Sequence, residues 1–153
     1  MTNRRKMYAV SVTAGKEMAV LEKLNKTDGV KGYVPRCVVE LRRGGFWHKE
    51  EKILIPGYVF IECKFNYNIY YKIKGITHVH SWIGKGIPSM MCDEDAEFIK
   101  FMANGGEAIP PQSITGSFLR RTIIKDINKR QRRIKVQFSV MGKMHTVTFG
   151  YLN

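Results

Sequence analysis

The sequence predicts an α+β protein made of a mixed N-terminal domain and a small all-β module. Over residues 7–103, short β-rich runs alternate with segments whose apolar residues recur at helical spacing. After residue 111, only short alternating runs typical of strands remain. Between these parts, residues 104–111 contain two glycines and two prolines, a composition typical of a linker. We therefore expect domains at 7–103 and 112–153, joined by a linker at 104–111.

The first elements follow from apolar spacing. Met7 to Val12 is an apolar run with β-branched residues, which predicts a strand. Over residues 16–26 the apolar residues recur about three apart, which predicts a helix with one apolar stripe. That stripe consists of Met18, Val20, Leu21 and Leu24. Lys16 and Glu17 lie off the stripe and are expected on the polar side of the helix.

The remaining elements are short. Gly44 and Gly45 predict the turn of a hairpin over 37–54, and Pro56-Gly57 turns the chain into a strand at 58–63. A short helix is expected over 68–74, a strand over 77–83, and a helix over 93–103 whose acidic first turn complements the helix dipole. The C-terminal module is expected to have β segments at 122–124, 134–138 and 145–149.

Charge is the main functional clue in the composition. The 153 residues include 26 Lys and Arg against 13 Asp and Glu, a net charge of +13, and 44% of the residues are hydrophobic. A disordered basic tail is therefore excluded, and a folded protein that binds a polyanion, usually nucleic acid, is expected. The alternative is a basic protein with a solvated surface. Residues 104–153 hold 9 basic and 2 acidic side chains, so the last third has the higher charge density.

Other patterns exclude several classes of protein. Cys37, Cys63 and Cys92 are far apart and form neither a metal-binding nor a disulfide pattern, so free thiols in a reducing, cytoplasmic setting are expected. No apolar run reaches the ~20 residues of a membrane span, and no signal peptide is expected. The histidines and carboxylates are scattered, so we expect no enzyme, catalytic residue, metal or cofactor.

Two basic segments are candidate nucleic-acid contacts. Arg42 and Arg43 precede Phe46-Trp47 at the hairpin tip, and aromatic and basic side chains together can stack on bases and neutralise phosphates. The alternative is that the aromatic rings pack inward while the arginines are solvated. Residues 129–133 place four cations in five positions, which favours contact with RNA or DNA over a solubilised loop.

One apolar segment is a candidate protein contact. Residues 53–60 form the most apolar run of the chain. From Val59 onward this run predicts a buried strand. Ile55, Pro56 and Tyr58 lie at the preceding turn, where exposed apolar side chains would suit a protein partner.

Five motifs in a fixed order carry a family resemblance: Met7-Tyr8-Ala9-Val10, Gly15-Lys16-Glu17, Tyr33-Val34-Pro35-Arg36, Glu40-Leu41-Arg42-Arg43-Gly44 and Ile55-Pro56-Gly57-Tyr58-Val59-Phe60. In this order they resemble the N-terminal domain of the NusG family of transcription elongation factors. The segment that begins at Gly116-Ser117-Phe118 is similar to the KOW domain that follows in this family. The basic residues at 129–133 are most like those of specialised antiterminator paralogues of the LoaP type.

The resemblance implies both a fold and a set of contacts. It implies a four-stranded antiparallel sheet flanked by helices, followed by a small KOW β-barrel. This sequence departs from the family in that the strand that normally opens the barrel is short or missing, since only residues 112–115 precede Gly116. The N-terminal domain of such factors docks on the clamp helices of RNA polymerase near the non-template DNA strand. The residues carried over for polymerase contact are Tyr8, Ile55, Pro56 and Tyr58. Those for non-template or upstream DNA are Lys16, Arg42 and Arg43. Those for RNA are Lys129, Arg130, Arg132, Arg133 and Lys135.

These expectations combine into one functional hypothesis with two alternatives. The chain is expected to be a monomeric, non-catalytic factor that binds elongating RNA polymerase and promotes processive antitermination of a specific operon. Its KOW domain is expected to contact a structured leader in the nascent RNA. The first alternative is a general elongation factor that couples polymerase to pausing, termination or translation. The second is a stand-alone RNA-binding or ribosome-associated module.

Overall fold

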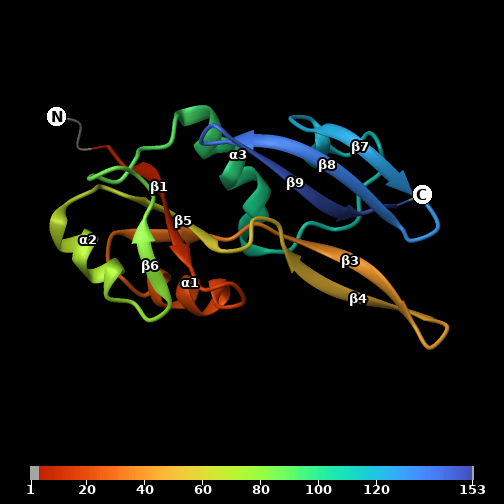
Figure 1. Ribbon diagram of the computed structural model, residues 1–153, viewed down its shortest axis with the longest axis horizontal. Coiled ribbons are helices and arrows are strands. Elements are labelled where there is room, and N and C mark those ends of the chain that lie inside the picture. Colours follow the sequence, from red (N-terminus) through yellow and green to blue (C-terminus); the bar gives the residue numbers. More distant parts are fainter. Residues whose placement is uncertain (1–3, 153) are drawn as a thin grey trace. The chain divides into compact units, whose positions relative to one another are not determined.

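The computed structural model describes residues 4–152 (Figure 1). Residue contacts divide the chain into two compact units. The first unit comprises the residues up to Val34 together with Pro56–Ile99, and the second comprises Pro35–Ile55 together with the residues from Lys100 onward. The domain boundaries expected from the sequence follow chain order, whereas in these units the segment 35–55 belongs with the C-terminal residues.

The first unit contains a four-stranded antiparallel sheet of order β2-β5-β1-β6. Its strands are β1 (Lys6–Val12), β2 (Val30–Tyr33), β5 (Tyr58–Cys63) and β6 (Val79–Trp82). On the central strand β1, Val10 pairs with Val59 on one side and with Trp82 on the other. Both valines are fully buried, so this register places the apolar side chains of the predicted strands in the core.

Three α-helices accompany these strands: α1 (Glu17–Asn25), α2 (Tyr67–Lys74) and α3 (Asp93–Ala103), the last of which continues into the second unit. The Asn66 side chain caps α2 by accepting a hydrogen bond from the backbone N–H of Ile69 at 2.9 Å. The predicted apolar stripe of α1 is wrong at its first residue, Met18. Val20 and Leu24 are fully buried, but Met18 is 40% exposed. Glu17, expected on the polar side, is buried in its place.

The second unit contains a hairpin and a three-stranded sheet. The hairpin strands are β3 (Arg36–Arg43) and β4 (Phe46–Ile53), and the sheet strands are β7 (Ile123–Asn128), β8 (Arg133–Val140) and β9 (Lys143–Gly150). Two short 3₁₀ turns, η1 (Asn104–Gly106) and η2 (Ser117–Leu119), precede the sheet. Alternate residues of β8 are buried, from Ile134 to Val140, as its sequence pattern predicts.

Residues 109–112 run along the hairpin and the chain end. Ile109 is fully buried, its N–H donates to the Arg36 carbonyl at 2.7 Å, and its carbonyl accepts from the Val38 N–H at 2.8 Å. Gln112 forms an isolated parallel bridge with Tyr151 where a first barrel strand was expected to be short or missing. The predicted α+β fold is confirmed, with its four-stranded antiparallel sheet and its small C-terminal β module.

Two further features bear on the sequence predictions. No helix within residues 4–152 has both the length and the apolar character needed to cross a membrane. All three cysteines are free, as predicted, with Cys37 and Cys63 buried and Cys92 exposed. Burial raises the pKa of the Cys37 thiol to about 12 and that of the Cys63 thiol to about 11.

Candidate nucleic-acid interface

The connection between β7 and β8, residues 128–133, is termed the basic turn. The Asn128 side chain closes it by accepting a hydrogen bond from the Gln131 N–H at 3.0 Å. Lys129 and Arg130 are exposed at its end. Arg132 has a left-handed backbone with φ of 57°, which is uncommon for a residue other than glycine. The turn therefore exposes Lys129 and Arg130 to solvent, whereas Arg132 is half-buried.

Arg132 contacts the β3–β4 hairpin instead of pointing freely into solvent. Its Nη1 lies 3.1 Å from Glu40 Oε2, and its guanidinium lies 4.0 Å from the centre of the Trp47 ring. Glu40 is on β3 and Trp47 is on β4. An ion pair combined with a cation–π contact thus joins the basic turn to the hairpin. The two aromatic residues of the hairpin tip therefore differ. Trp47 is partly covered, as expected for a ring that packs inward, whereas Phe46 is 73% exposed, as expected for a contact surface.

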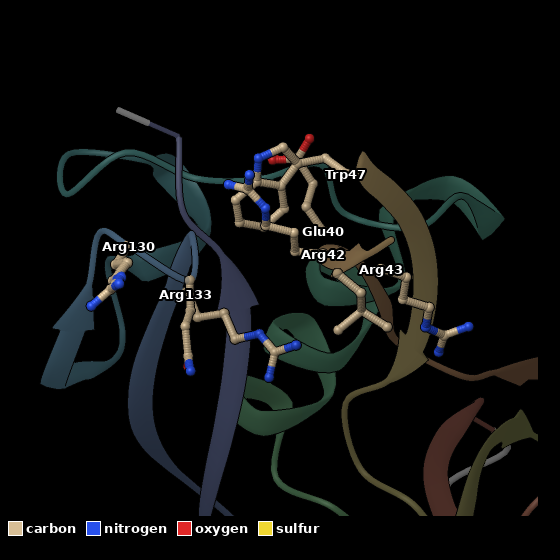
Figure 2. A pocket seen from close by; sticks show the side chains of 8 residues that line it. Glu40, Arg42, Arg43, Trp47, Arg130 and Arg133 are labelled. Atoms are coloured by element: carbon tan, nitrogen blue, oxygen red, sulfur yellow. The ribbon is translucent and has the colours of Figure 1, made fainter. Parts of the chain in front are cut away.

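A cleft of about 770 Å³ lies between the hairpin and the basic turn (Figure 2). Its lining includes four arginines and one glutamate, a net charge of +3 for these residues: Arg42, Arg43, Arg130, Arg133 and Glu40. The charges are only partly compensated. Arg43 lies 3.6 Å from the Glu50 carboxylate, and Arg42 lies 5.8 Å from the centre of the Trp47 ring. Among the described residues, the buried Nε of Arg133 has no hydrogen-bond partner.

The predicted polymerase-contact residues differ in exposure. Pro56 is exposed and Tyr58 is half-buried, whereas Tyr8 is 5% exposed and Ile55 is 4% exposed. The Tyr8 ring packs edge-on against Trp82, with ring centroids 5.9 Å apart. The structure therefore places Pro56 and Tyr58 where a partner can touch them, and it places Tyr8 and Ile55 in the interior.

The predicted DNA-contact residues fall in different units. Lys16 is exposed immediately before α1 in the first unit. Arg42 and Arg43 are exposed at the end of β3 in the second unit, and both are among the residues that line the cleft. The structure thus groups these two arginines with the residues that were assigned to RNA.

A sequence model of the family described as transcription termination factor NusG matches residues 5–100, well over half of the chain. The chain belongs to the NusG family. Members of this family are transcription factors without enzymatic activity, and they bind RNA polymerase. The resemblance that the ordered motifs carried is thereby confirmed at the level of the NusG family.

Two NusG proteins extend the likeness beyond residue 100. The transcription termination/antitermination protein NusG of Vibrio vulnificus (strain CMCP6) is 24% identical over 162 residues, which span 92% of this chain and 89% of that protein. A solved structure concerned with domain interaction in Thermotoga maritima NusG is 23% identical and has a TM-score of 0.60. It covers 96% of this chain and 94% of the other, so the NusG fold is shared over both units.

Sequence reasoning missed one buried carboxylate in this NusG-family chain. Glu17 is 1% exposed; its Oε1 accepts from the Gly15 N–H at 2.7 Å and its Oε2 from the Gly57 N–H at 2.8 Å. Gly57 has φ of 84°, a backbone conformation that glycine adopts readily, and its carbonyl accepts from the Val12 N–H at 2.9 Å. Glu17 therefore holds the turn that carries Pro56, and no periodicity in the sequence could have shown this role.

Proposed function

We propose that this NusG-family chain binds elongating RNA polymerase through the Pro56–Tyr58 turn and promotes processive antitermination of a specific operon. In this proposal the basic turn contacts RNA, as in the specialised LoaP-type paralogues. The observation that carries the RNA contact is the placement of exposed cations on the small three-stranded sheet and its turn. Lys129 and Arg130 are exposed on the turn, and Lys135 is exposed on β8 between the buried Ile134 and Val136.

Electrostatics supports nucleic acid as the partner of this surface. Each phosphate that a lysine or arginine neutralises releases counterions, which favours binding and makes it depend on salt. The segment that carries the basic turn has few carboxylates of its own, since residues 104–153 contain 2 acidic against 9 basic side chains. One of the nearby carboxylates, Glu40, is already paired with Arg132. The exposed cations of the basic turn are therefore suited to phosphate contact.

The polymerase contact is proposed for the apolar turn before β5. Exposed apolar side chains at a fixed turn are typical of a protein interface. Pro56 is exposed and Tyr58 is half-buried, and the Gly57 N–H between them is held by the Glu17 carboxylate. In this proposal Pro56 and Tyr58 make the direct contact. Tyr8 and Ile55 are buried, so in this proposal they support the fold and do not touch the polymerase directly.

Transcription across an intrinsic terminator tests the antitermination step. Purified polymerase would transcribe templates with and without a candidate leader, in the presence or absence of this chain. We expect readthrough to increase only when the leader is present. No gain at any leader would contradict antitermination, and a leader-independent change in pausing would instead favour the general elongation factor.

Two variants test the division of labour between the units. Reversing Lys129, Arg130 and Lys135 to Glu should abolish RNA binding and spare co-purification with polymerase. Tyr58→Asp should weaken co-purification with polymerase and spare RNA binding. Ile87→Ala is the matched control for Tyr58→Asp, because it removes an exposed apolar side chain from the same unit. Equal loss of both activities in either variant would contradict the proposed division.

A further inference from the structure

The cleft between the hairpin and the basic turn concentrates like charges without a protein counter-ion for each of them. Four arginines from two segments far apart in the sequence line it, against the single carboxylate of Glu40. Arg133 lines the cleft, and among residues 4–152 its buried Nε has no hydrogen-bond partner. Buried donors are almost always hydrogen-bonded, so an unpaired donor on a residue of this arginine-lined cleft favours an anion as the ligand.

Arg132 holds the two sides of this cleft together. Its guanidinium is engaged by the Glu40 carboxylate at 3.1 Å and by the Trp47 ring at 4.0 Å. Its left-handed backbone, with φ of 57°, is a strained conformation that persists where the surrounding contacts over-determine it. Arg132 is therefore a positioning residue for the cleft, and it is not available as a phosphate contact in this arrangement.

We propose that the hairpin tip and the basic turn form one site for single-stranded RNA, which rests on the proposed RNA contact of the basic turn. In this site Arg42, Arg43, Arg130 and Arg133 bind phosphates of the same strand. Arg42 and Arg43, which the family resemblance implied as DNA contacts, are RNA contacts in this site. Arg132, which the resemblance implied as an RNA contact, is a positioning residue in this site.

The lining of the cleft favours an unpaired RNA strand. Its volume of about 770 Å³ is large enough for a nucleotide, within the ~300–1,000 Å³ range of ligand pockets. Arginine planes and aromatic rings stack on unpaired bases, and Phe46 at the hairpin tip is 73% exposed for such a contact. The side-chain amide of Gln131, which also lines the cleft, supplies hydrogen-bonding groups that a 2′-hydroxyl or a base edge can use.

Binding of one short RNA to matched variants tests the proposal. The probe is a fluorescently labelled single-stranded RNA of about six nucleotides, a length similar to the smaller known single-strand sites. Its affinity for the full chain would be measured by anisotropy over a range of salt concentrations. The variants are Arg42→Glu with Arg43→Glu on the hairpin, and Arg130→Glu with Arg133→Glu on the turn. The control is Lys72→Glu with Lys85→Glu, which reverses the same charge at exposed lysines of the other unit.

We expect each arginine pair to weaken RNA binding at least tenfold more than the control does. For two lost phosphate contacts, the slope of log affinity against log salt should flatten by about 1.4. If the hairpin pair behaves like the control while the turn pair loses binding, the shared site is wrong and the RNA contact of the basic turn stands. If neither pair exceeds the control, both proposals fail.

Two further measurements do not depend on how the variants fold. Ultraviolet crosslinking of the same RNA to the unmodified chain, mapped by peptide mass spectrometry, should place crosslinks on both the hairpin tip and the basic turn. Crosslinks confined to one segment would overturn the shared site. DNA of the same sequence should bind more weakly than the RNA, and DNA binding of equal or greater strength would overturn the assignment to RNA.

Discussion

Glu17→Ala is expected to destabilise the first unit far more than an ordinary substitution on a helix. The Glu17 side chain is 1% exposed and accepts two backbone hydrogen bonds, from Gly15 at 2.7 Å and from Gly57 at 2.8 Å. It also lies in the first turn of α1, where a negative charge interacts favourably with the helix dipole. Alanine removes both acceptors and leaves the helix start without this carboxylate.

The size of the effect follows from these two bonds. A hydrogen bond to a charged group contributes about 1.5–3 kcal/mol to stability. Gly15 is exposed, so water can replace the carboxylate at its N–H and the loss there lies at the low end. The Gly57 N–H is less accessible, so its loss lies higher in the range. We therefore expect Glu17→Ala to lower the free energy of unfolding of this unit by about 3–4 kcal/mol.

Urea unfolding followed by tryptophan fluorescence measures this loss in the unit that carries it. Trp82 lies in the first unit and Trp47 in the second, so a Trp47→Phe background leaves Trp82 as the reporter. With a slope of about 2 kcal/mol per molar urea, the midpoint should fall by about 1.5–2 M. Glu22→Ala on the same helix is the control. It removes an exposed ion pair with Lys26 and should cost only about 0.3–0.5 kcal/mol.

A Glu17→Ala loss no larger than that of Glu22→Ala would refute the assigned role of the buried carboxylate. The same variant also bears on function, because the Gly57 N–H fixes the turn between Pro56 and Tyr58. At a temperature where the variant is still folded, its co-purification with polymerase should fall.

Two further predictions concern titratable groups. Because burial raises the pKa of Cys37 to about 12 and of Cys63 to about 11, both thiols stay neutral near pH 8. Iodoacetamide should therefore label only Cys92 in the folded chain, and early labelling of all three would contradict this. Burial, helped by the nearby Lys143 charge, lowers the pKa of His145. Its stabilising effect is present above the unfolded pKa of about 6.5 and is lost as pH falls through the lower folded value. The free energy of unfolding, measured by urea titration, should therefore fall less between pH 7 and pH 5 in His145→Gln than in the unmodified chain. An equal fall in both would exclude His145 as the source of this pH dependence.

Elements set by local pattern were predicted well. The strand Tyr58–Cys63 and the helix Asp93–Ala103 have the bounds that their sequences indicated, because apolar alternation and an acidic first turn act within a few residues. The face of α1 was predicted less well. Apolar spacing alone selected Met18, but the Gly57 N–H stabilises a carboxylate at Glu17, and that bond joins residues 40 positions apart.

The grouping of segments could not be predicted from local pattern. Nothing near Arg36 or Ile109 in the sequence indicates that their backbones bond to each other, because such pairing depends on the whole chain path. The same holds for the Glu40–Arg132 ion pair, whose partners lie 92 positions apart. The candidate residues of the basic turn were identifiable from charge density, whereas their grouping with the hairpin arginines required the structure.

The three arginines of the basic turn show why a run of cations is not a uniform patch. In sequence they are equivalent, but the fold gives each a different environment. Arg130 is exposed, Arg132 is engaged by Glu40 and Trp47, and Arg133 has a buried Nε without a partner among the described residues. The number of cations in the sequence therefore overestimates the phosphates that this segment alone can neutralise. If the two segments bind one strand, the hairpin arginines provide the additional phosphate contacts. The salt dependence of RNA binding measures how many phosphate contacts are made.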